Sequence, residues 1–303
     1  MSSARPMLSI IVPTYNWPQA LDAVLASLFE QDDAGFEIIV ADDGSGPETR
    51  AVIEKWHSRS GPRLSHVWQP DEGYRRARSL NLGASGGRGE YFLFVDGDCL
   101  VRRGFVAAVR RAALPGWFLA SKRVNLSPEL SRRVIDESLP VWRWSVASWF
   151  LRAPRELLSS HRESARPGLL LPVRDRRRPW RGNQPEFRPP YDGYGFMFGV
   201  DRRDFEQANG FDMRFVSWGG EDKDLATRLR HAGLRCGWPG GHATVLHLWH
   251  SVRKGAPGSN ASLVAEAEAS GRVEALDGLR ELADQVSAKR VGASSSSREP
   301  EKR

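Results

Sequence analysis

Two aspartates, Asp96 and Asp98, flank a single glycine, Gly97, directly after the apolar run YFLFV. A glycine in a tight exit from a strand lets two nearby carboxylates turn toward one point, where they repel each other unless a cation or a proton lies between them. Oxygen ligands of this kind suit Mg²⁺ or Mn²⁺, ions that commonly bridge diphosphates. The spacing therefore indicates a divalent metal site, and a solvated Asp-Gly turn is the alternative.

A second acidic pair, Asp42 and Asp43, follows the apolar run FEIIVA and precedes Gly44 and Ser45. The serine and the following Pro47 favour the start of a helix, so a second cluster of metal ligands is not expected nearby. These carboxylates are better suited to accept hydrogen bonds from a base or a ribose. The alternative is a helix N-terminus whose acidic residues compensate the helix dipole.

A third acidic pair, Glu221 and Asp222, follows Trp218, Gly219 and Gly220 and opens a helical pattern. A Gly-Gly pair lets the backbone approach a ligand closely, and acids at a helix start are stabilised by its positive end. That end is expected to lower the pKa of Glu221 or Asp222 and keep it ionised, as a general base at neutral pH must be. Dipole compensation alone is the alternative, but it leaves the Trp-Gly-Gly sequence without a role.

Two histidines, His247 and His250, come at the end of a strand-like run over 242–248 and just after it. Two imidazoles near the end of a strand could complete a metal site that the aspartates begin. Their three-residue spacing requires a bend in the chain, and two inert surface histidines are the alternative.

Three arginines, Arg75, Arg76 and Arg78, lie in the opening turn of a predicted helix over 75–85. Cations at this end oppose the helix dipole, which a purely structural role does not explain and neutralisation of a diphosphate does. A solvated basic face is the alternative. Neither G-x-G-x-x-G nor G-x-x-x-x-G-K-[ST] is present, which argues against a dinucleotide enzyme or a P-loop NTPase.

The elements that must position these residues alternate between strand and helix. Hydrophobic periodicity predicts strands at 8–13, 36–41, 64–68, 90–95, 195–201 and 242–248, and helices near 18–31, 47–59, 75–85, 104–113, 202–208, from Glu221 and over 261–288. This alternation predicts an α/β fold with a mostly parallel central sheet and helices on both faces. Ligands of such sheets bind beyond the carboxyl ends of the strands, where the acidic motifs lie.

Composition narrows the class of protein further. The chain has 303 residues, a formal net charge of +7 and two cysteines, Cys99 and Cys236, too few for a disulfide framework. Because there is no apolar run long enough to cross a bilayer and Met7–Pro13 lacks a signal-peptide cleavage site, a cytoplasmic protein is expected. The segment 141–190 combines eleven arginines and four acids with four tryptophans and seven prolines, a composition typical of contact with anionic lipid headgroups or with a phosphorylated glycan. A solvated basic loop is the alternative.

The motifs occur in the order IVPTYNW, VADDGS, GYRRARSLNLG, FVDGD, ANGFD, SWGGEDKDLATRL and LHLWHS. This order resembles the inverting glycosyltransferases with the GT-A fold, the large family-two group of bacterial sugar transferases. Over its latter half the sequence is similar to the galactosyl- and N-acetylgalactosaminyltransferase branch that carries the WGGED motif. The resemblance covers about residues 7–122 and 191–254, and it implies a Rossmann-like central sheet.

The resemblance implies a role in donor binding for a set of residues spread over six motifs. They are Pro13, Tyr15, Asn16, Asp42, Asp43, Arg76, Asn81, Asp96, Gly97, Trp218, Gly219 and Gly220. Within this set, Asp42 or Asp43 would read the uracil or the ribose. Arg76 and Asn81 would approach the base and the diphosphate.

For the reaction itself, the resemblance implies Asp222 as the catalytic base and Glu221 as the residue that orients the sugar. The metal ligands would be Asp96, Asp98, His247 and His250, and the cofactor Mn²⁺ or Mg²⁺. Lys223 stands where many relatives have a third acid and is expected to face outward on its helix.

The sequence thus predicts a metal-dependent inverting hexosyltransferase. It would move a hexose or N-acetylhexosamine, of galactose type, from a UDP-sugar to a saccharide hydroxyl of a bacterial surface or lipid-linked glycan. An anionic surface at the inner membrane face is a further expected partner, and nucleic acid is not. The alternatives are a nucleic-acid-binding protein that uses the basic aromatic segment and a sugar nucleotidyltransferase, against which the loop TYNWPQA argues because it is not Gly-rich and basic.

Five parts are expected along the chain, divided by changes in composition. They are a nucleotide-sugar-binding part (1–122), a basic Trp/Pro-rich insertion on the acceptor or membrane side (123–190), an acceptor and catalytic part (191–255), a helical segment (256–290) and a disordered tail (291–303).

Overall fold

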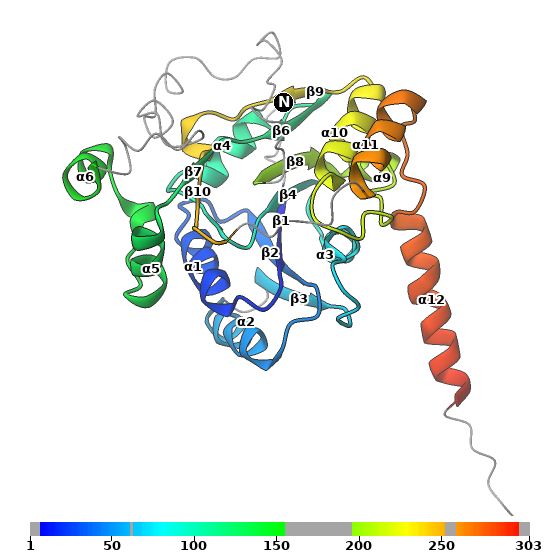
Figure 1. Ribbon diagram of the computed structural model, residues 1–303, viewed down its shortest axis with the longest axis horizontal. Helices are drawn as coiled ribbons and strands as arrows, with labels where there is room; N and C mark the ends of the chain where they lie inside the picture. The colour runs from blue at the N-terminus through cyan, green and yellow to red at the C-terminus, as the bar shows by residue number, and fades with distance from the viewer. Residues whose placement is uncertain (1–6, 61–62, 155–195, 252–258, 297–303) are drawn as a thin grey trace, which may run out of the picture.

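The computed structural model describes residues 7–60, 63–154, 196–251 and 259–296, and its centre is a seven-stranded sheet with the order β3-β2-β1-β4-β8-β6-β9 (Figure 1). Along the chain the strands are β1 (Leu8–Thr14), β2 (Phe36–Asp42), β3 (Leu64–Trp68), β4 (Tyr91–Val95), β6 (Trp117–Ala120), β8 (Met197–Asp201) and β9 (Arg235–Gly237).

The pairing of the strands brings the acidic motifs to one edge of the sheet. Strands β1, β2, β3 and β4 pair in parallel, with Leu8 opposite Phe36 and Thr14 opposite Asp42. Strand β8 runs antiparallel between β4 and β6, while β9 is parallel to β6. The expected α/β fold with a mostly parallel sheet is confirmed, and the carboxyl ends of β1, β2 and β4 meet at the same edge.

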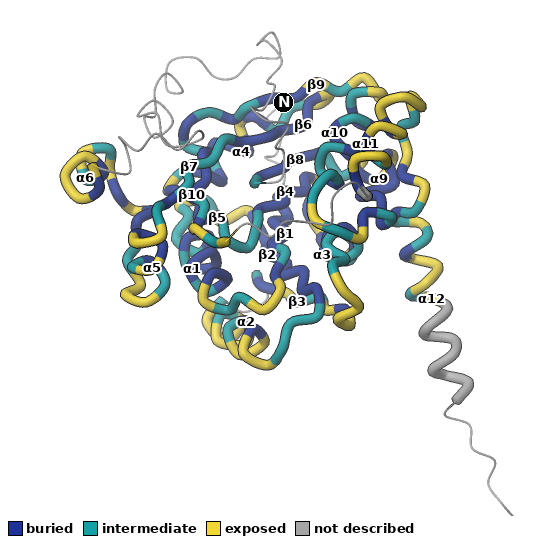
Figure 2. The backbone as a smooth tube through the Cα atoms, in the orientation of Figure 1, coloured by how far each residue is buried: buried dark blue, intermediate teal, exposed yellow. Residues whose placement is uncertain are grey.

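Helices cover both faces of this sheet. They include α1 (Pro18–Phe29), α2 (Pro47–Ser60), α3 (Arg76–Gly86), α4 (Phe105–Ala112), α9 (Arg202–Gln207) and α10 (Glu221–His231). Successive residues of a strand point to opposite faces, so Ile10 packs in one buried cluster with α1 and α4, while Ile11 packs in another with α3, α9 and α10. Figure 2 shows the strands buried between these layers and the outer helix faces exposed.

A small second sheet joins the histidine motif to the Asp96–Asp98 turn. Its order is β5-β10-β7, with β5 (Cys99–Leu100), β10 (Val245–His247) and β7 (Arg123–Asn125). His247 is paired with Cys99 in antiparallel register, and the backbone N–H of Leu248 donates to the carbonyl oxygen of Asp98 at 2.9 Å. The strand predicted over 242–248 is shorter than expected because a 3₁₀ turn occupies Gly241–Ala243.

The C-terminal helical stretch is divided rather than continuous. Helix α11 (Ser259–Ser270) ends before Gly271, whose positive φ of 65° reverses the chain, and α12 (Leu279–Ser296) then begins against α3. Helix α12 extends away from the body and continues through Ser296, into the segment predicted to be a tail (Figure 1). Among the residues described, none of the helices combines the length and apolar composition that crossing a bilayer requires.

The tryptophans of the basic segment correct an expectation. Helices α5 (Pro128–Asp136) and α6 (Val146–Arg152) lie at one edge of the molecule, and Trp142, Trp144 and Trp149 are 5%, 8% and 0% exposed in the core cluster around them. They stabilise this edge and do not form an interfacial or base-stacking surface. Trp180 and the remainder of the expected insertion lie outside the described residues.

Candidate active site

The loops after β1 and β2 are tied together at the carboxyl edge of the sheet. The backbone N–H of Asn16 donates to Ser45 Oγ, and the backbone N–H of Gly46 donates back to Asn16 Oδ1, each at 2.9 Å. Asn16 adopts φ +47°, a conformation that asparagine tolerates better than most residues. Tyr15 is 37% exposed and donates its hydroxyl to Asp71 Oδ2 at 2.9 Å. Tyr15 and Asn16 therefore border one surface with the start of α2.

The two aspartates that end β2 are buried and face different partners. Asp42 accepts hydrogen bonds from the Ser45 backbone N–H at 2.8 Å and from His66 Nε2 at 3.1 Å. Burial opposes its ionisation, but these bonds outweigh burial and hold the pKa of Asp42 below its ordinary value. Asp43 accepts from the Arg75 backbone N–H at 2.9 Å and from Gln69, yet burial raises its pKa. A base or ribose would meet two carboxylates with different proton affinities.

Gly97 allows the loop after β4 to lie directly on the end of β1. A Cβ atom at this position would come within 2.3 Å of the Pro13 carbonyl oxygen, which is backbone and cannot move aside cheaply. The contact explains why a glycine separates Asp96 from Asp98 and why both lie beside the first loop.

Arg76 joins acidic residues that are far apart in the sequence. It is the first residue of α3, and its guanidinium pairs through Nη2 with Asp96 Oδ1 and through Nη1 with Glu221 Oε1. Desolvation opposes its charge, but Asp96 and Glu221 raise the pKa of Arg76 well above its ordinary value. The opening turn of α3 therefore neutralises carboxylates of the protein, whereas the sequence suggested a diphosphate.

The carboxylates at this site outnumber the cations that contact them. Burial, followed by the influence of nearby charges, raises the pKa of Asp96 to about 6 even though Arg76 acts in the opposite direction. Burial and the adjacent Glu221 charge raise the pKa of Asp222 to about 7. The expectation that the helix end lowers the pKa of Asp222 is wrong, because burial and a neighbouring acid outweigh the dipole. A value near 7 still suits a general base at neutral pH.

The chain approaches α10 through a turn that only glycines adopt without strain. Gly219 and Gly220 have φ values of +83° and +102°, and Trp218 beside them is 58% exposed. In the first turn of the helix, Asp222 Oδ1 accepts from the Lys223 backbone N–H at 2.8 Å. Glu221 is 4% exposed, and within the described part of the chain its buried Oε2 atom has no hydrogen-bond partner. This turn leads into two acids that lie close to Arg76, and it leaves Trp218 exposed beside them.

Asp98, His247 and His250 form a group with the chemistry of a metal site. Asp98 Oδ2 lies 3.6 Å from His247 Nε2 and 3.3 Å from His250 Nε2, and one ligand atom from each residue falls within 4.8 Å of the others. The Nδ1 atom of His250 is 3.0 Å from the Ser251 carbonyl oxygen, an arrangement that directs Nε2 to a cation. Trp17 packs edge-on against His250 with the ring centroids 5.9 Å apart.

This donor set combines oxygen and nitrogen atoms and therefore fits Mn²⁺ better than Mg²⁺, which prefers oxygen ligands. One carboxylate and two imidazoles converge, with Asp96 and Cys99 in an overlapping group around Asp98. Burial raises the pKa of the Cys99 thiol well above its ordinary value, so the oxygen and nitrogen atoms remain the available ligands.

Asn81 does not lie where the resemblance places it. It is fully buried, its Nδ2 donates to the Phe211 carbonyl oxygen at 2.8 Å, and its Oδ1 accepts the Phe211 backbone N–H at 2.9 Å. Both ends of the amide are thereby used to join α3 to the ANGFD turn. The assignment of Asn81 to base and diphosphate binding is corrected to a structural role.

Two residues that contact the acidic pair after β2 were not predicted from the sequence. His66 contacts Asp42, and Gln69 contacts Asp43. They lie in and just after β3, so the rule that ligands gather at the carboxyl ends of parallel strands would have found them.

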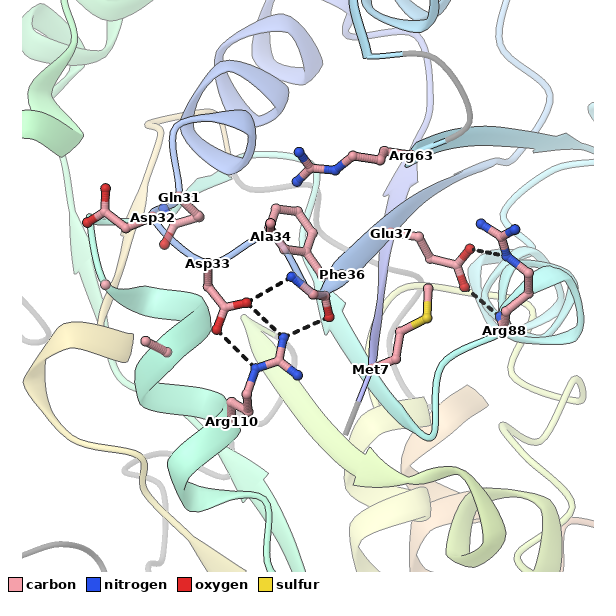
Figure 3. A pocket seen from close by; sticks show the side chains of 13 residues that line it. Met7, Gln31, Asp32, Asp33, Ala34, Phe36, Glu37, Arg63, Arg88 and Arg110 are labelled. Atoms are coloured by element: carbon pink, nitrogen blue, oxygen red, sulfur yellow. Dashed lines mark hydrogen bonds and ion pairs between the residues drawn. The ribbon is translucent and has the colours of Figure 1, made fainter. Parts of the chain in front are cut away.

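A cavity of about 830 Å³ lies at the opposite edge of the sheet, by the amino ends of the parallel strands (Figure 3). Two of its arginines are neutralised within the protein, Arg110 by Asp33 and Arg88 by Glu37. None of the predicted site residues lines it, so the chemistry lies at the carboxyl edge.

Comparison with known proteins agrees with this fold. The family model "Glycosyl transferase family 2" matches residues 9–115, and the model "N-terminal domain of galactosyltransferase" matches residues 178–251. Over these two ranges the chain is similar to glycosyltransferases, and its mostly parallel α/β sheet is consistent with the GT-A fold.

Among its relatives is the validoxylamine A glucosyltransferase of Streptomyces hygroscopicus subsp. jinggangensis, 30% identical over 248 residues, which are 77% of this chain and 53% of that protein. The GalNAc(5)-diNAcBac-PP-undecaprenol beta-1,3-glucosyltransferase of Campylobacter jejuni is 28% identical over 138 residues, 44% of each chain. The chain spans about half the length of the first of these relatives.

Among solved structures, a mannosyltransferase from Pyrobaculum calidifontis, in complex with GDP-Man and Mn²⁺, has the same fold. It superposes with a TM-score of 0.52 at 20% identity and covers 95% of this chain and 76% of its own.

Proposed function

We propose that this protein is a metal-dependent inverting glycosyltransferase that moves a hexose or N-acetylhexosamine from a UDP-sugar to a saccharide hydroxyl. The observation that carries the proposal is the meeting, through Arg76, of the Asp96–Asp98 turn with the acidic start of α10. A donor-side metal group and an acceptor-side base are thus joined at the carboxyl edge of one sheet.

In the proposed mechanism, Asp222 accepts the proton of the acceptor hydroxyl as the hydroxyl oxygen forms a bond to the anomeric carbon. The bond from that carbon to the UDP oxygen breaks, and UDP leaves from the opposite face, so an α-linked donor gives a β-linked product. Glu221, held by Arg76, orients the sugar. A divalent cation held by Asp98, His247 and His250, together with Asp96, would neutralise the charge that develops on the diphosphate.

The identity of the sugar is the next part of the proposal, and we assign a galactose-type donor. The WGGED motif and the galactosyltransferase family model over 178–251 support this assignment. The two named relatives are glucosyltransferases and favour glucose instead. Release of UDP should be compared with UDP-galactose, UDP-glucose and their N-acetylamino forms, each with Mn²⁺ and a panel of saccharide acceptors. Fastest turnover with UDP-glucose would exclude the galactose assignment and keep the reaction type, and an α-linked product would exclude inversion from an α-linked donor.

For the acceptor we propose a lipid-linked or surface glycan at an anionic membrane face. The buried tryptophans do not support contact with a membrane, but helix α6 does. Its residues Phe150 and Leu151 are 52% and 84% exposed beside Arg152. Adjacent exposed apolar residues with a basic neighbour favour a lipid interface. Sedimentation with anionic vesicles at low salt, lost in a Phe150→Ser/Leu151→Ser variant, is the expected result. Equal sedimentation of both proteins would contradict this placement.

A further inference from the structure

The turn that precedes the two acids of α10 is held by a side chain from α11. Asn260, 9% exposed, donates through Nδ2 to the carbonyl oxygen of Ser217 at 2.8 Å and to that of Gly219 at 2.6 Å. An amide nitrogen carries two hydrogens, so a single asparagine satisfies both carbonyls. These two carbonyl groups flank Trp218, and their direction is set from outside the turn.

Helix α11 also packs against the last residue before the acids. A Cβ atom at Gly220 would come within 3.2 Å of Val264 Cγ2 and 3.0 Å of Phe215 Cε1. Val264, one helical turn after Asn260, is 7% exposed, and Ala267 is fully buried. One face of α11 therefore lies directly on the turn and on α10.

Ion pairs fix the same two helices further along. Lys223 Nζ lies 3.2 Å from Glu268 Oε1, so Lys223 is engaged with α11 and the expectation that it simply faces outward is wrong. Arg272 Nη2 lies 3.2 Å from Asp224 Oδ1, and Asp224 is fully buried against Arg228. The two residues after Asp222 are therefore both held from outside α10: Lys223 contacts α11, and Asp224 contacts Arg272 in the segment after α11.

We propose that α11 is the element that positions the acidic start of α10, with Asn260 as the positioning residue for the Trp218–Asp222 turn. The proposal rests on the proposed function of Asp222 and Trp218 and extends it to a part of the chain that neither matching family model covers. Asn260 acts through the backbone of the turn: it fixes the carbonyls of Ser217 and Gly219, and so the direction of Trp218 and the place of the Asp222 carboxyl group.

This role predicts a particular division of kinetic effects. Arg76 joins Asp96 on the donor side to Glu221 at the start of α10, whereas Asp222 and the exposed Trp218 belong to the turn that Asn260 holds. Loss of the Asn260 bonds should therefore lower kcat by a larger factor than it weakens UDP binding, because a reacting group displaced by a fraction of an ångström reacts more slowly. A loss of UDP affinity would report on Trp218, Gly219 and Gly220, which the resemblance assigns to the donor.

The test compares Asn260→Leu, which keeps the size of the side chain and removes its donor, with two matched controls. Ala265→Ser changes an exposed position of α11, and Leu282→Ala lowers stability from α12 without contacting the turn. Donor-binding sites are counted by calorimetry with UDP and Mn²⁺, and kcat is expressed per site. We expect kcat per site to fall roughly tenfold or more in Asn260→Leu and to stay unchanged in both controls.

A second measurement reports on the turn without any reaction. Hydrogen exchange of peptides over 214–226 should become roughly tenfold faster or more in Asn260→Leu, since two hydrogen bonds are lost, and should not change in Ala265→Ser. Wild-type kcat per site, or unchanged exchange, would overturn the proposal. If the wild-type protein transfers no sugar at all, the proposed function fails, and exchange alone then decides whether α11 holds the turn.

Discussion

Removing the guanidinium of Arg76 should destabilise the protein in a strongly pH-dependent way. Arg76→Met keeps most of the side-chain volume but leaves Asp96 and Glu221 without their cation. The side chains are 14% exposed for Arg76, 25% for Asp96 and 5% for Glu221. Breaking a buried ion pair costs about 3–5 kcal/mol, and because water partly screens Asp96, we expect a loss of about 3 kcal/mol near pH 8.

The sign of the pH dependence follows from the carboxyl groups left behind. The pKa of Asp96 is already raised to about 6 with Arg76 in place, and it rises further without it. A carboxyl group whose pKa is higher in the folded state than in the unfolded state lowers stability above its unfolded pKa. That penalty disappears as the pH falls through the folded value, because the protonated group needs no cation. The loss of unfolding free energy in Arg76→Met, relative to the wild type, should therefore be smaller near pH 5 than near pH 8.

Urea unfolding followed by tryptophan fluorescence, with linear extrapolation to water, measures both quantities. Arg133→Met is the matched control, since Arg133 forms an exposed pair with Glu137 at 3.2 Å. That variant should lose less than about 0.5 kcal/mol at either pH. An equal loss in the two variants near pH 8, or a deficit of Arg76→Met that grows on acidification, would refute this account of the cluster.

Three further predictions concern the reaction and its metal. Asp222→Asn should lower kcat by ~10²–10⁴-fold with UDP affinity kept. In the wild type, kcat should rise with pH through about 7, the value to which burial raises the pKa of Asp222, because the ionised carboxylate is the base. If kcat of Asp222→Asn rises with pH in the same way, the rise belongs to another group. Excess EDTA should abolish turnover, and Asp98→Ala should abolish Mn²⁺ binding in calorimetry. Full activity of the wild type in EDTA, or full activity of Asp98→Ala, would exclude the metal assignment. Gly97→Ala should lower both stability and UDP affinity, because its Cβ would lie 2.3 Å from the Pro13 carbonyl oxygen. The control Gly86→Ala should lower neither, because its Cβ would lie 3.6 Å from the nearest atom. Wild-type UDP affinity in Gly97→Ala would show that the close approach is not needed.

Strands β1, β2 and β4 of the parallel half could be predicted because they are buried on both sides and each reads as a short apolar run, whereas β3 is exposed at Ser65 and Trp68. β2 is the clearest case, with every residue from Phe36 to Asp42 buried. The same periodicity failed at the C-terminus, where it indicated one helix over 261–288. The break comes from the left-handed conformation at Gly271 and from docking of the following segment, whose Ala275 backbone N–H donates to the Ala208 carbonyl oxygen. Neither cause is visible in local hydrophobic spacing.

For the site, the acidic motifs after β2 and β4 could be predicted, since the carboxyl ends of parallel strands meet at one edge. Glu221 and Asp222 open a helix and His247 lies in the small second sheet, so their approach to that edge depends on the tertiary structure. The partners of Arg76 could not be predicted, because Asp96 and Glu221 lie 20 and 145 residues away. The pKa of Asp222 was misjudged for a related reason: the helix end is visible in the sequence, while burial and the approach of other acids depend on the tertiary structure. Asn260 carries no sequence signal, because a lone asparagine at a helix start usually serves as a cap.

Strands β6 and β8 are neighbours in the main sheet although residues 121–196 separate them in the sequence. Ala120 is opposite Phe198 in the antiparallel register, and the Arg123 guanidinium lies over the Phe196 ring at 4.0 Å from its centroid. In the sequence, the residues between Ala120 and Met197 are therefore inserted between two strands that pair with each other. Doubling the length of a segment closed in this way costs only about 0.6 kcal/mol in chain entropy. Chain entropy thus sets little limit on the length of the insertion. Its first part is nevertheless fixed, because Leu126, Leu130 and Trp149 are buried in the core cluster that also contains α1, and replacing them would remove packing from a helix that covers the sheet.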